Sequence, residues 1–139
     1  MSGFRRAFLV HWNDCDPAGI VFHAHFIRWM DEGFTDMMLA RGVDFAALAR
    51  EDASFRGSPL VDVRCAFRAP ARFADTLTHE IAWPVFGDGR SYRLAHRFLL
   101  PDVRLAAEGE QVRIWGRDEA GTLRAVPMPP AIAAALGGH

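Results

Sequence analysis

The chain contains no lysine, and all 16 of its basic residues are arginines. The absence of lysine excludes every mechanism that forms a Schiff base on a lysine amine. With 17 acidic residues the formal net charge is −1, which provides no general attraction to nucleic acid or to an anionic membrane. No apolar run reaches the roughly 18 residues of a membrane span, so we expect neither nucleic acid nor membrane among the partners.

Cysteine is scarce as well, because Cys15 and Cys65 are the only two in 139 residues. Two cysteines are too few for a disulfide scaffold, and we expect both thiols to be buried and inert. The first residues lack the apolar stretch of a secretory signal, which predicts a cytoplasmic protein. The length and the 50% hydrophobic composition predict a single domain over residues 1–139.

One long helix is predicted from about His23 to Arg41. Its apolar residues recur at spacings of three and four, the pattern of an amphipathic helix; they are Phe26, Ile27, Met30, Phe34, Met37, Met38 and Ala40. Gly42 follows, and glycine readily adopts the positive φ of a helix C-terminus. A shorter helix is predicted from Asp44 to Arg50.

The rest of the chain alternates between β-rich runs and turn signals. We expect a first strand over residues 4–12 and hairpin turns at residues 87–89 and 118–121. The other predicted strands are Leu60–Ala69, Thr76–Phe86, Ser91–Leu100, Leu105–Arg117 and Thr122–Pro127, and a last helical turn is predicted at Ala131–Leu136. One apolar helix laid across an antiparallel sheet predicts an α+β fold. The edge strands of so small a sheet favour pairing with a second copy.

The turn that precedes the long helix holds the densest group of reactive side chains. Asp16 comes just before Pro17, which disfavours helical backbone at Asp16, and Gly19 permits a sharp reversal. We expect the Asp16 carboxylate near the positive end of the helix, where it stays ionised and can act as a base or a nucleophile. Unpaired N–H groups of the first helical turn can stabilise an oxyanion there. A plain helix cap or an Asx turn explains Asp16 equally well.

Two neighbours in the turn compete with Asp16. Asp14 lies on the same side as Asp16 if the strand continues, and otherwise hydrogen-bonds the backbone of the turn. Cys15 is disfavoured as a nucleophile because the flanking carboxylates oppose a thiolate.

Three histidines, His11, His23 and His25, raise the question of a metal site. Histidines two residues apart do not share a helix face, and no spaced set of Cys and His ligands follows. No metal and no other cofactor is therefore predicted. A neutral histidine ring at the helix start is instead a possible hydrogen-bond partner of a substrate acyl group.

Five arginines are spread over the later strands. They fit either a solvated sheet face or a site for a phosphorylated ligand; they are Arg90, Arg93, Arg97, Arg113 and Arg124. The sequence contains no Walker A motif, no Gly-x-Gly-x-x-Gly after a strand and no Gly-x-Ser-x-Gly elbow. These absences argue against a nucleotide hydrolase, a dinucleotide-binding protein and a serine hydrolase.

The run Asp14-Cys-Asp-Pro-Ala-Gly-Ile-Val-Phe22, followed by Arg28-Trp-Met-Asp31, closely resembles the 4-hydroxybenzoyl-CoA thioesterase family. Members of this family are acyl-CoA thioesterases with the hotdog fold, in which an antiparallel sheet wraps around one long central helix. The segment from Gly57 to Val61 resembles the family's entry to its second strand. The resemblance covers nearly the whole chain and implies that this chain hydrolyses an acyl-CoA.

The resemblance also implies roles for individual residues. Asp16 matches the family's catalytic aspartate, described as a nucleophile that forms a mixed anhydride or as a general base that activates water. The backbone N–H of His23 matches the group that polarises the thioester carbonyl. Arg124 matches a residue that holds the CoA phosphates, and Arg90 is assigned to the same task. The remaining substrate-binding positions are Phe22, His25, Asp31 and Ser58.

The chain departs from the family pattern at two positions. His23 stands where the 4-hydroxybenzoyl enzyme has tyrosine, and His25 stands where it has asparagine. The run His23-Ala-His-Phe26 resembles instead the His-Ala-Asn-Tyr run of Tol–Pal-associated acyl-CoA thioesterases. We therefore predict as substrate either an aromatic acyl-CoA of the hydroxybenzoyl or benzoyl type or a short-chain acyl-CoA.

The family further implies that two subunits join their sheets, with active sites at the dimer interface, so a homodimer or homotetramer is expected. Two alternative functions stay open from the sequence. One is an acyl-CoA-binding module without turnover. The other is a hotdog hydratase or dehydratase that would use His25 with Asp31.

Overall fold

The long helix is present as α1 (Ala24–Ala40) in the computed structural model, which describes residues 2–87 and 89–137. Its buried residues recur every three or four positions, as the sequence predicts; they are Phe26, Trp29, Met30, Gly33, Phe34, Met37 and Met38. The helix ends at Ala40, and Gly42, two residues further on, has a φ of +79°. The Val43 N–H then donates to the Met38 carbonyl at 2.8 Å, a closure typical of helices that end at glycine.

Two short helices accompany α1. The first, α2 (Phe45–Glu51), begins at Asp44, whose carboxylate accepts hydrogen bonds from the N–H groups of Ala46 and Ala47. The second, α3 (Pro130–Ala135), begins with proline, which suits the first turn because the N–H it lacks would have no helical partner. None of the described helices is both long and apolar enough to cross a membrane.

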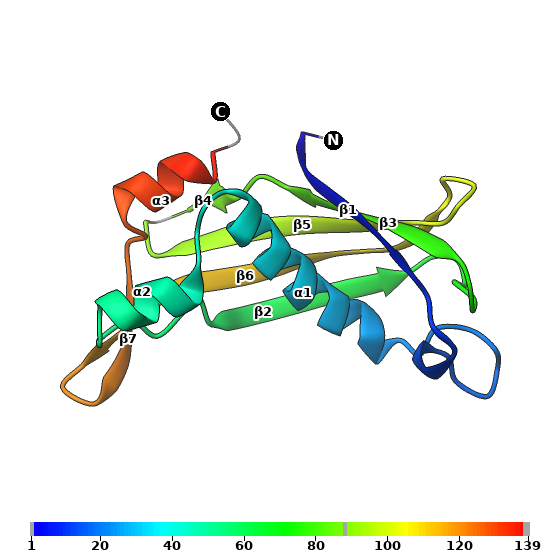
Figure 1. Cartoon of the computed structure of the whole chain (residues 1–139), viewed down its shortest axis with the longest axis horizontal. Coiled ribbons are helices and arrows are strands. Elements are labelled where there is room, and N and C mark those ends of the chain that lie inside the picture. Colours follow the sequence, from blue (N-terminus) through cyan, green and yellow to red (C-terminus); the bar gives the residue numbers. More distant parts are fainter. Residues whose placement is uncertain (1, 88, 138–139) are drawn as a thin grey trace.

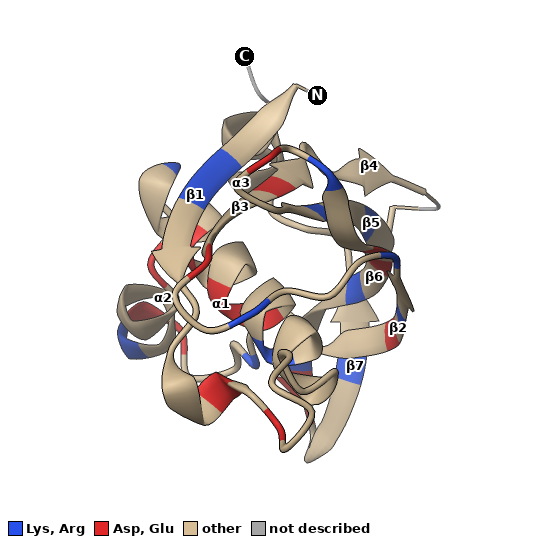
Figure 2. Ribbon diagram, turned by 90° about the vertical axis from the view of Figure 1, so that its right-hand side faces the viewer, with Lys and Arg blue, Asp and Glu red and all other residues tan. Residues whose placement is uncertain are grey.

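Seven strands form one antiparallel sheet, which with α1 confirms the α+β prediction. The strands are β1 (Gly3–Leu9), β2 (Leu60–Phe67), β3 (Thr76–Ala82), β4 (Val85–Phe86), β5 (Ser91–Leu99), β6 (Leu105–Glu119) and β7 (Thr122–Val126). The order across the sheet is β1-β3-β5-β6-β2, with β4 paired to β5 and β7 to β6. Helix α1 crosses strands β5, β6 and β2 obliquely (Figure 1), and the sheet curves around the helix when viewed from the side (Figure 2).

The predicted strand Thr76–Phe86 is wrong as a continuous element. The structure divides it into β3 and β4, with Trp83 and Pro84 between them. Proline has no N–H to donate to a sheet ladder. The interruption changes the pairing, since β3 joins both β1 and β5 whereas β4 pairs with β5 alone.

Other boundaries shift by a few residues. The first strand ends at Leu9 because Trp12–Asp14 form a short 3-10 helix instead of continuing it. The predicted hairpin at 118–121 is present, with positive φ at both Ala120 and Gly121, as a tight type I′ turn requires. The centre of the other predicted hairpin, Asp88, lies outside the described residues.

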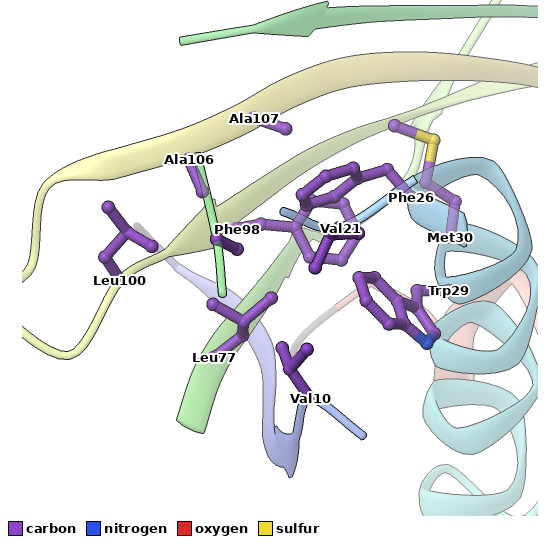
Figure 3. Close-up of a cluster of buried hydrophobic side chains, with 11 residues drawn as sticks. Val10, Val21, Phe26, Trp29, Met30, Leu77, Phe98, Leu100, Ala106 and Ala107 are labelled. Carbon is purple, nitrogen blue, oxygen red and sulfur yellow. The ribbon is translucent and has the colours of Figure 1, made fainter. Parts of the chain in front are cut away.

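The buried side chains of α1 face the sheet in two clusters along the helix. The first surrounds the N-terminal half of the helix, where Phe26 and Trp29 pack against Phe98 of β5 (Figure 3). The second surrounds its C-terminal half and includes Trp115 of β6. The first cluster matters for function because the turn rich in carboxylates folds directly beside it.

Candidate active site

The turn before α1 is closed by its own backbone. The Asp16 N–H donates to the Ile20 carbonyl at 2.9 Å, and the Gly19 N–H donates to the Asp16 carbonyl at 2.9 Å. Gly19 has a φ of +79°, which explains why glycine suits this position. One carboxylate oxygen of Asp16, Oδ1, accepts the Ala18 N–H at 2.8 Å. The Asx turn foreseen for Asp16 is therefore present, and it leaves the second carboxylate oxygen without a hydrogen bond among the described residues.

Asp14 has different surroundings from Asp16. It is buried, and its Oδ2 accepts the His11 N–H at 2.8 Å. Its Oδ1 lies 3.2 Å from the guanidinium of Arg28 on α1, and its carbonyl accepts the Phe22 N–H at 2.9 Å. The 3-10 helix breaks the extended path that would have aligned the two carboxylates. Asp14 thus ties the turn to the helix, the second of the two roles weighed from the sequence.

A pocket of about 400 Å³ opens beside Asp16. Its polar lining consists of Asp16, His23 and Arg68. Its apolar lining is contributed by the turn, α1, the end of β2 and β6, through Ile20, Val21, Phe26, Phe67, Ala69, Pro70, Ala71 and Ala106. Such a mostly apolar concavity with a few convergent polar groups is typical of a small-molecule site.

His23 occupies the start of α1 within this pocket. It is the N-cap residue, with helical φ of −54° and ψ of −33°. Its backbone N–H donates no hydrogen bond among the described residues, as expected for the first groups of a helix. The exposed ring lies 4.4 Å from that of Phe22 and 6.0 Å from that of Phe67, between ring centroids. Asp16 and His23, whose backbone N–H is unpaired among the described residues, therefore line one pocket at the positive end of a helix.

The four predicted substrate-binding side chains do not line this pocket within one chain. Phe22 is 41% exposed beside the His23 ring. The Nδ1 atom of His25 lies 3.3 Å from Nε of Arg28. Asp31 and Ser58 belong to a polar cluster beneath the middle of α1, in which Arg113 contacts both.

The two predicted CoA-binding arginines lie on the surface away from the pocket. Arg90 lies just before β5, and Arg124 lies on β7 directly opposite Arg117 of β6. Arg124 forms no ion pair among the described residues, whereas Arg117 lies 3.5 Å from Asp52.

Arg68 and Phe67 are pocket residues that the sequence did not reveal. Both are more than 40 residues from Asp16 in the chain, and they reach it only because α1 crosses β2. The sole local signal that Arg68 belongs to a site is its position as a basic residue directly after the end of strand β2. Arg68 also lies 3.3 Å from Glu108.

Neither cysteine serves this pocket. Both are partly exposed, where burial was predicted. Desolvation raises the pKa of Cys65 to about 11, so its thiol is neutral near pH 7. Within the described part of the chain, no three or more His, Cys, Asp or Glu residues are grouped as metal ligands.

A smaller pocket of about 230 Å³ lies between α2 and β6. Its walls are mainly Leu48, Phe55 and Trp115, and its charged groups, Asp52 and Arg117, pair with each other. It contains neither an unpaired carboxylate nor a long helix N-terminus. The Asp16 pocket is therefore the candidate active site.

An antiparallel sheet wrapped around one long helix defines the hotdog fold. The sequence matches the family model of the thioesterase-like superfamily over residues 10–136. The chain belongs to this superfamily. The predictions of the family, of the hotdog fold and of an enzyme that hydrolyses thioesters are thereby confirmed.

Individual relatives agree with this assignment. The 4-hydroxybenzoyl-CoA thioesterase of Pseudomonas sp. strain CBS-3 is 24% identical over 123 residues, covering 86% of this chain and 87% of that protein. A crystal structure of a 4-hydroxybenzoyl-CoA thioesterase variant with 4-hydroxybenzoyl-CoA superimposes with a TM-score of 0.89 at 21% identity, covering 99% of this chain and all of the other. A gentisyl-coenzyme A thioesterase gives a TM-score of 0.80 at 29% identity, covering 93% of this chain and 98% of its own.

Proposed function

We propose that the chain, acting as a single domain, hydrolyses the thioester of an aromatic acyl-CoA in the Asp16 pocket. The observation that carries this proposal is the shared pocket of the Asp16 carboxylate and the unpaired N–H of His23. A carboxylate supplies a nucleophile or a base, and a free helix N–H supplies a donor for an oxyanion. Both are required for acyl transfer, and neither depends on a cofactor.

Two routes use the same geometry. In the nucleophilic route the free oxygen of Asp16 attacks the thioester carbon, the CoA sulfur leaves as a thiolate, and water hydrolyses the resulting mixed anhydride. In the general-base route Asp16 takes a proton from water, the hydroxide attacks, and that proton passes to the leaving sulfur. In both routes the carbonyl oxygen becomes an oxyanion that accepts the His23 N–H. Rapid quenching with mass spectrometry distinguishes them, because only the first places the acyl group on Asp16.

The apolar lining of the pocket supports an aromatic acyl group. Phe26 and Phe67, with ring centroids 5.8 Å apart, offer flat surfaces on which an aromatic ring packs favourably. The named relatives act on 4-hydroxybenzoyl and gentisyl thioesters, which are aromatic. A short-chain acyl group would leave much of this surface uncovered.

Arginines on the surface supply the charge for the CoA phosphates. Arg68 stands at the pocket itself. Arg124 lies opposite Arg117 across β6 and β7; Arg117 is paired with Asp52, which leaves the guanidinium of Arg124 without an ion pair among the described residues and open to an anion. We assign Arg124 to the phosphates on this ground, and Arg90 with it.

A second copy of the chain completes the site in this proposal. Strand β2 lies at one edge of the sheet, and its Val61 is 61% exposed. An apolar edge strand of this kind invites pairing with another chain. Asp31 does not line the Asp16 pocket of its own chain and its side chain is 56% exposed, so it would meet the acyl group from a second copy. Ser58 is buried, and its hydroxyl donates to the Ile114 carbonyl at 2.7 Å, so it is given no direct contact with the acyl group. Light scattering should give a dimer or tetramer, and a stable monomer would contradict this arrangement.

The test is thiol release from a panel of acyl-CoAs. The panel compares 4-hydroxybenzoyl-, benzoyl-, butyryl- and palmitoyl-CoA, and the aromatic substrates should have the highest kcat/KM. Asp16→Asn should lower kcat about 10²–10⁴-fold with little change in Tm, because asparagine also forms an Asx turn. Asp102→Asn is a matched control, since Asp102 forms the same turn with the Arg104 N–H outside the pocket. Near-normal turnover by Asp16→Asn would refute the assignment.

The two alternatives give different results in the same experiments. A binding module would be stabilised by acyl-CoA without releasing thiol. A hydratase would change the absorbance of an enoyl-CoA, but its histidine–acid pair is not formed. The His25 ring lies beside Arg28, and Asp31 accepts from Gln111 and Arg113.

A further inference from the structure

Polar side chains are buried where α1 crosses the centre of the sheet. His79 of β3, His96 of β5 and Gln111 of β6 are at most 1% exposed. They lie on three neighbouring strands, and polar groups buried to this degree are costly unless fully hydrogen-bonded. All their side-chain nitrogen and oxygen atoms have partners in the described part of the chain.

The hydrogen bonds join into one chain, which we call the Arg6–Asp31 relay. Nε of Arg6 lies 3.1 Å from Nδ1 of His79, and Nε2 of His79 lies 2.9 Å from Nδ1 of His96. Nε2 of His96 lies 3.0 Å from Oε1 of Gln111, whose Nε2 donates to Oδ1 of Asp31 at 2.8 Å. Five residues thus connect a guanidinium on β1 to a carboxylate on α1.

The two ends of the relay fix its direction. A guanidinium only donates, so Nδ1 of His79 must accept and its proton must lie on Nε2. His96 then accepts at Nδ1 and donates from Nε2 to the Gln111 carbonyl. From the other end, an ionised Asp31 only accepts, which requires the Gln111 amide nitrogen to face it. Both ends demand the same orientation at every link.

Burial keeps both histidines neutral, as this orientation requires. Desolvation lowers the pKa of His79 to about 2 and that of His96 to about 4, with mutual repulsion adding to the shift of His79. Neither ring gains or loses a proton near neutral pH, so they hold other groups in place and do not take part in acid–base chemistry.

Only one oxygen of Asp31 is held by the relay. Oδ1 accepts from both Gln111 and Arg113, and Arg113 is itself anchored on the Ser58 carbonyl at 2.9 Å. The side chain of Asp31 is nevertheless 56% exposed. Oδ2 accepts no hydrogen bond among the described residues, so a fixed and ionised carboxylate presents one free acceptor to the outside.

We propose that the Arg6–Asp31 relay positions the Asp31 carboxylate for a hydrogen-bond donor on the far end of the substrate acyl group, with Gln111 and His96 as positioning residues. This inference rests on the proposed function, in which Asp31 meets the acyl group. Fixing the acceptor in advance removes the entropy cost of ordering it when substrate binds. The fixed carboxylate also favours an acyl group that carries a hydroxyl over one that has no hydrogen-bond donor.

Gln111→Glu tests the last link because it exchanges a donor for an acceptor of the same shape. We expect kcat/KM for 4-hydroxybenzoyl-CoA to fall about 10- to 100-fold and that for benzoyl-CoA, which has no donor to lose, to fall less than about threefold. Adding Asp31→Asn restores a donor opposite Glu and should recover Tm without recovering the preference for hydroxybenzoyl. Val43→Ala, a buried change outside the relay, controls for lost stability and should leave the ratio of the two substrates unchanged. An equal loss for both substrates in Gln111→Glu would overturn the proposal.

Two measurements remain informative if turnover fails. Side-chain ¹⁵N spectra of the wild-type protein should show His79 and His96 as neutral Nε2–H tautomers from pH 5.5 to 8, and titration of either or a proton on Nδ1 would overturn the relay. Calorimetric binding of 4-hydroxybenzoyl- and benzoyl-CoA in the Asp16→Asn background tests positioning without chemistry. The wild-type protein could fail to hydrolyse any acyl-CoA while Gln111→Glu, added to Asp16→Asn, weakens the binding of 4-hydroxybenzoyl-CoA and not that of benzoyl-CoA. In that case the proposed function is wrong and the relay is supported. Equal weakening of both ligands would overturn the relay alone.

Discussion

Gly33 offers a direct physical test of how closely α1 lies on the sheet. It is the glycine in the middle of the helix, where alanine is normally favoured by about 1 kcal/mol. In this structure a Cβ at position 33 would lie 2.3 Å from Cε1 and 2.5 Å from Nδ1 of His79, and 3.0 Å from Nε of Arg6. The two distances to the His79 ring are at least 1 Å shorter than the usual separation of non-bonded carbon atoms, about 3.5 Å, and the distance to Arg6 is about 0.5 Å shorter.

Gly33→Ala should therefore destabilise the protein although it improves helix propensity. Overpacking costs about 1–3 kcal/mol, and separating Arg6 from His79 adds about 1 kcal/mol for the lost hydrogen bond. After subtracting the gain in propensity, we expect a net loss of about 2 kcal/mol, or roughly 5–10 °C in Tm for a chain of this size.

The assay is thermal unfolding followed by circular dichroism at one fixed protein concentration, because association would otherwise shift Tm. Thr35→Ala is the matched control. Thr35 lies two residues further along α1 and is exposed, and its hydroxyl only donates to the Asp31 carbonyl of the same helix at 3.2 Å. A gain in helix propensity of up to about 0.7 kcal/mol should therefore appear there without a clash and raise Tm slightly. A Tm for Gly33→Ala at or above that of the wild type would refute the close approach of α1 to His79.

Two further predictions concern pH and the CoA phosphates. Burial lowers the pKa values of His79 and His96 to about 2 and about 4, so below about pH 6.5 the unfolded chain binds more protons than the folded one. The stability that the two neutral rings contribute is complete well above that pH and should fall by about 4 kcal/mol, about 2 kcal/mol for each ring, between pH 7 and pH 5. Chemical denaturation at several pH values in this range measures the loss in the free energy of unfolding. In His96→Gln the dependence of that free energy on pH should be about half as large. The same dependence on pH in the variant and the wild type would contradict a neutral buried pair. Arg124→Gln should raise KM for acyl-CoA about 5- to 10-fold with kcat unchanged, and should not affect a thioester of N-acetylcysteamine, which lacks the phosphates. Arg93→Gln is the control, because Arg93 is paired with Glu110 at 2.7 Å, and an equal effect of both variants would reject the phosphate site.

The elements that follow local rules could be predicted from the sequence. The helix expected from about His23 to Arg41 is found at Ala24–Ala40, because a period of 3.6 residues and a terminal glycine are both local signals. The short helix capped by Asp44 is found for the same reason. The strand that fails, Thr76–Phe86, contains Pro84, and that proline was itself a local signal of the interruption.

The candidate site likewise contains residues that local sequence signals predict and residues that they do not. Asp16 and His23 are seven residues apart, and the turn between them brings both to one pocket. The sequence alone could therefore predict that they belong to the same site. Phe67 and Arg68 join them only through the position of β2, which depends on how β2 pairs with β6 over residues distant in sequence. No local pattern encodes that pairing, so the far wall of the pocket could not be foreseen.

For the buried relay, the alternating pattern of the strands predicts which side chains face the helix but not which of them hydrogen-bond to each other. His79 lies between Leu77 and Ile81 on β3, and the alternation of these strands marks the histidine as facing the helix. Only the register of three strands then shows that His79, His96 and Gln111 meet each other rather than three separate partners. One helix thereby carries two kinds of polar function. At its start His23 carries an unpaired N–H, which we propose as the donor to the oxyanion, while its middle is anchored to the sheet by hydrogen bonds that end on Asp31. If the relay positions Asp31 as proposed, the pairing of two copies sets the distance between the thioester chemistry at Asp16 of one chain and the acyl-group recognition by Asp31 of the partner subunit.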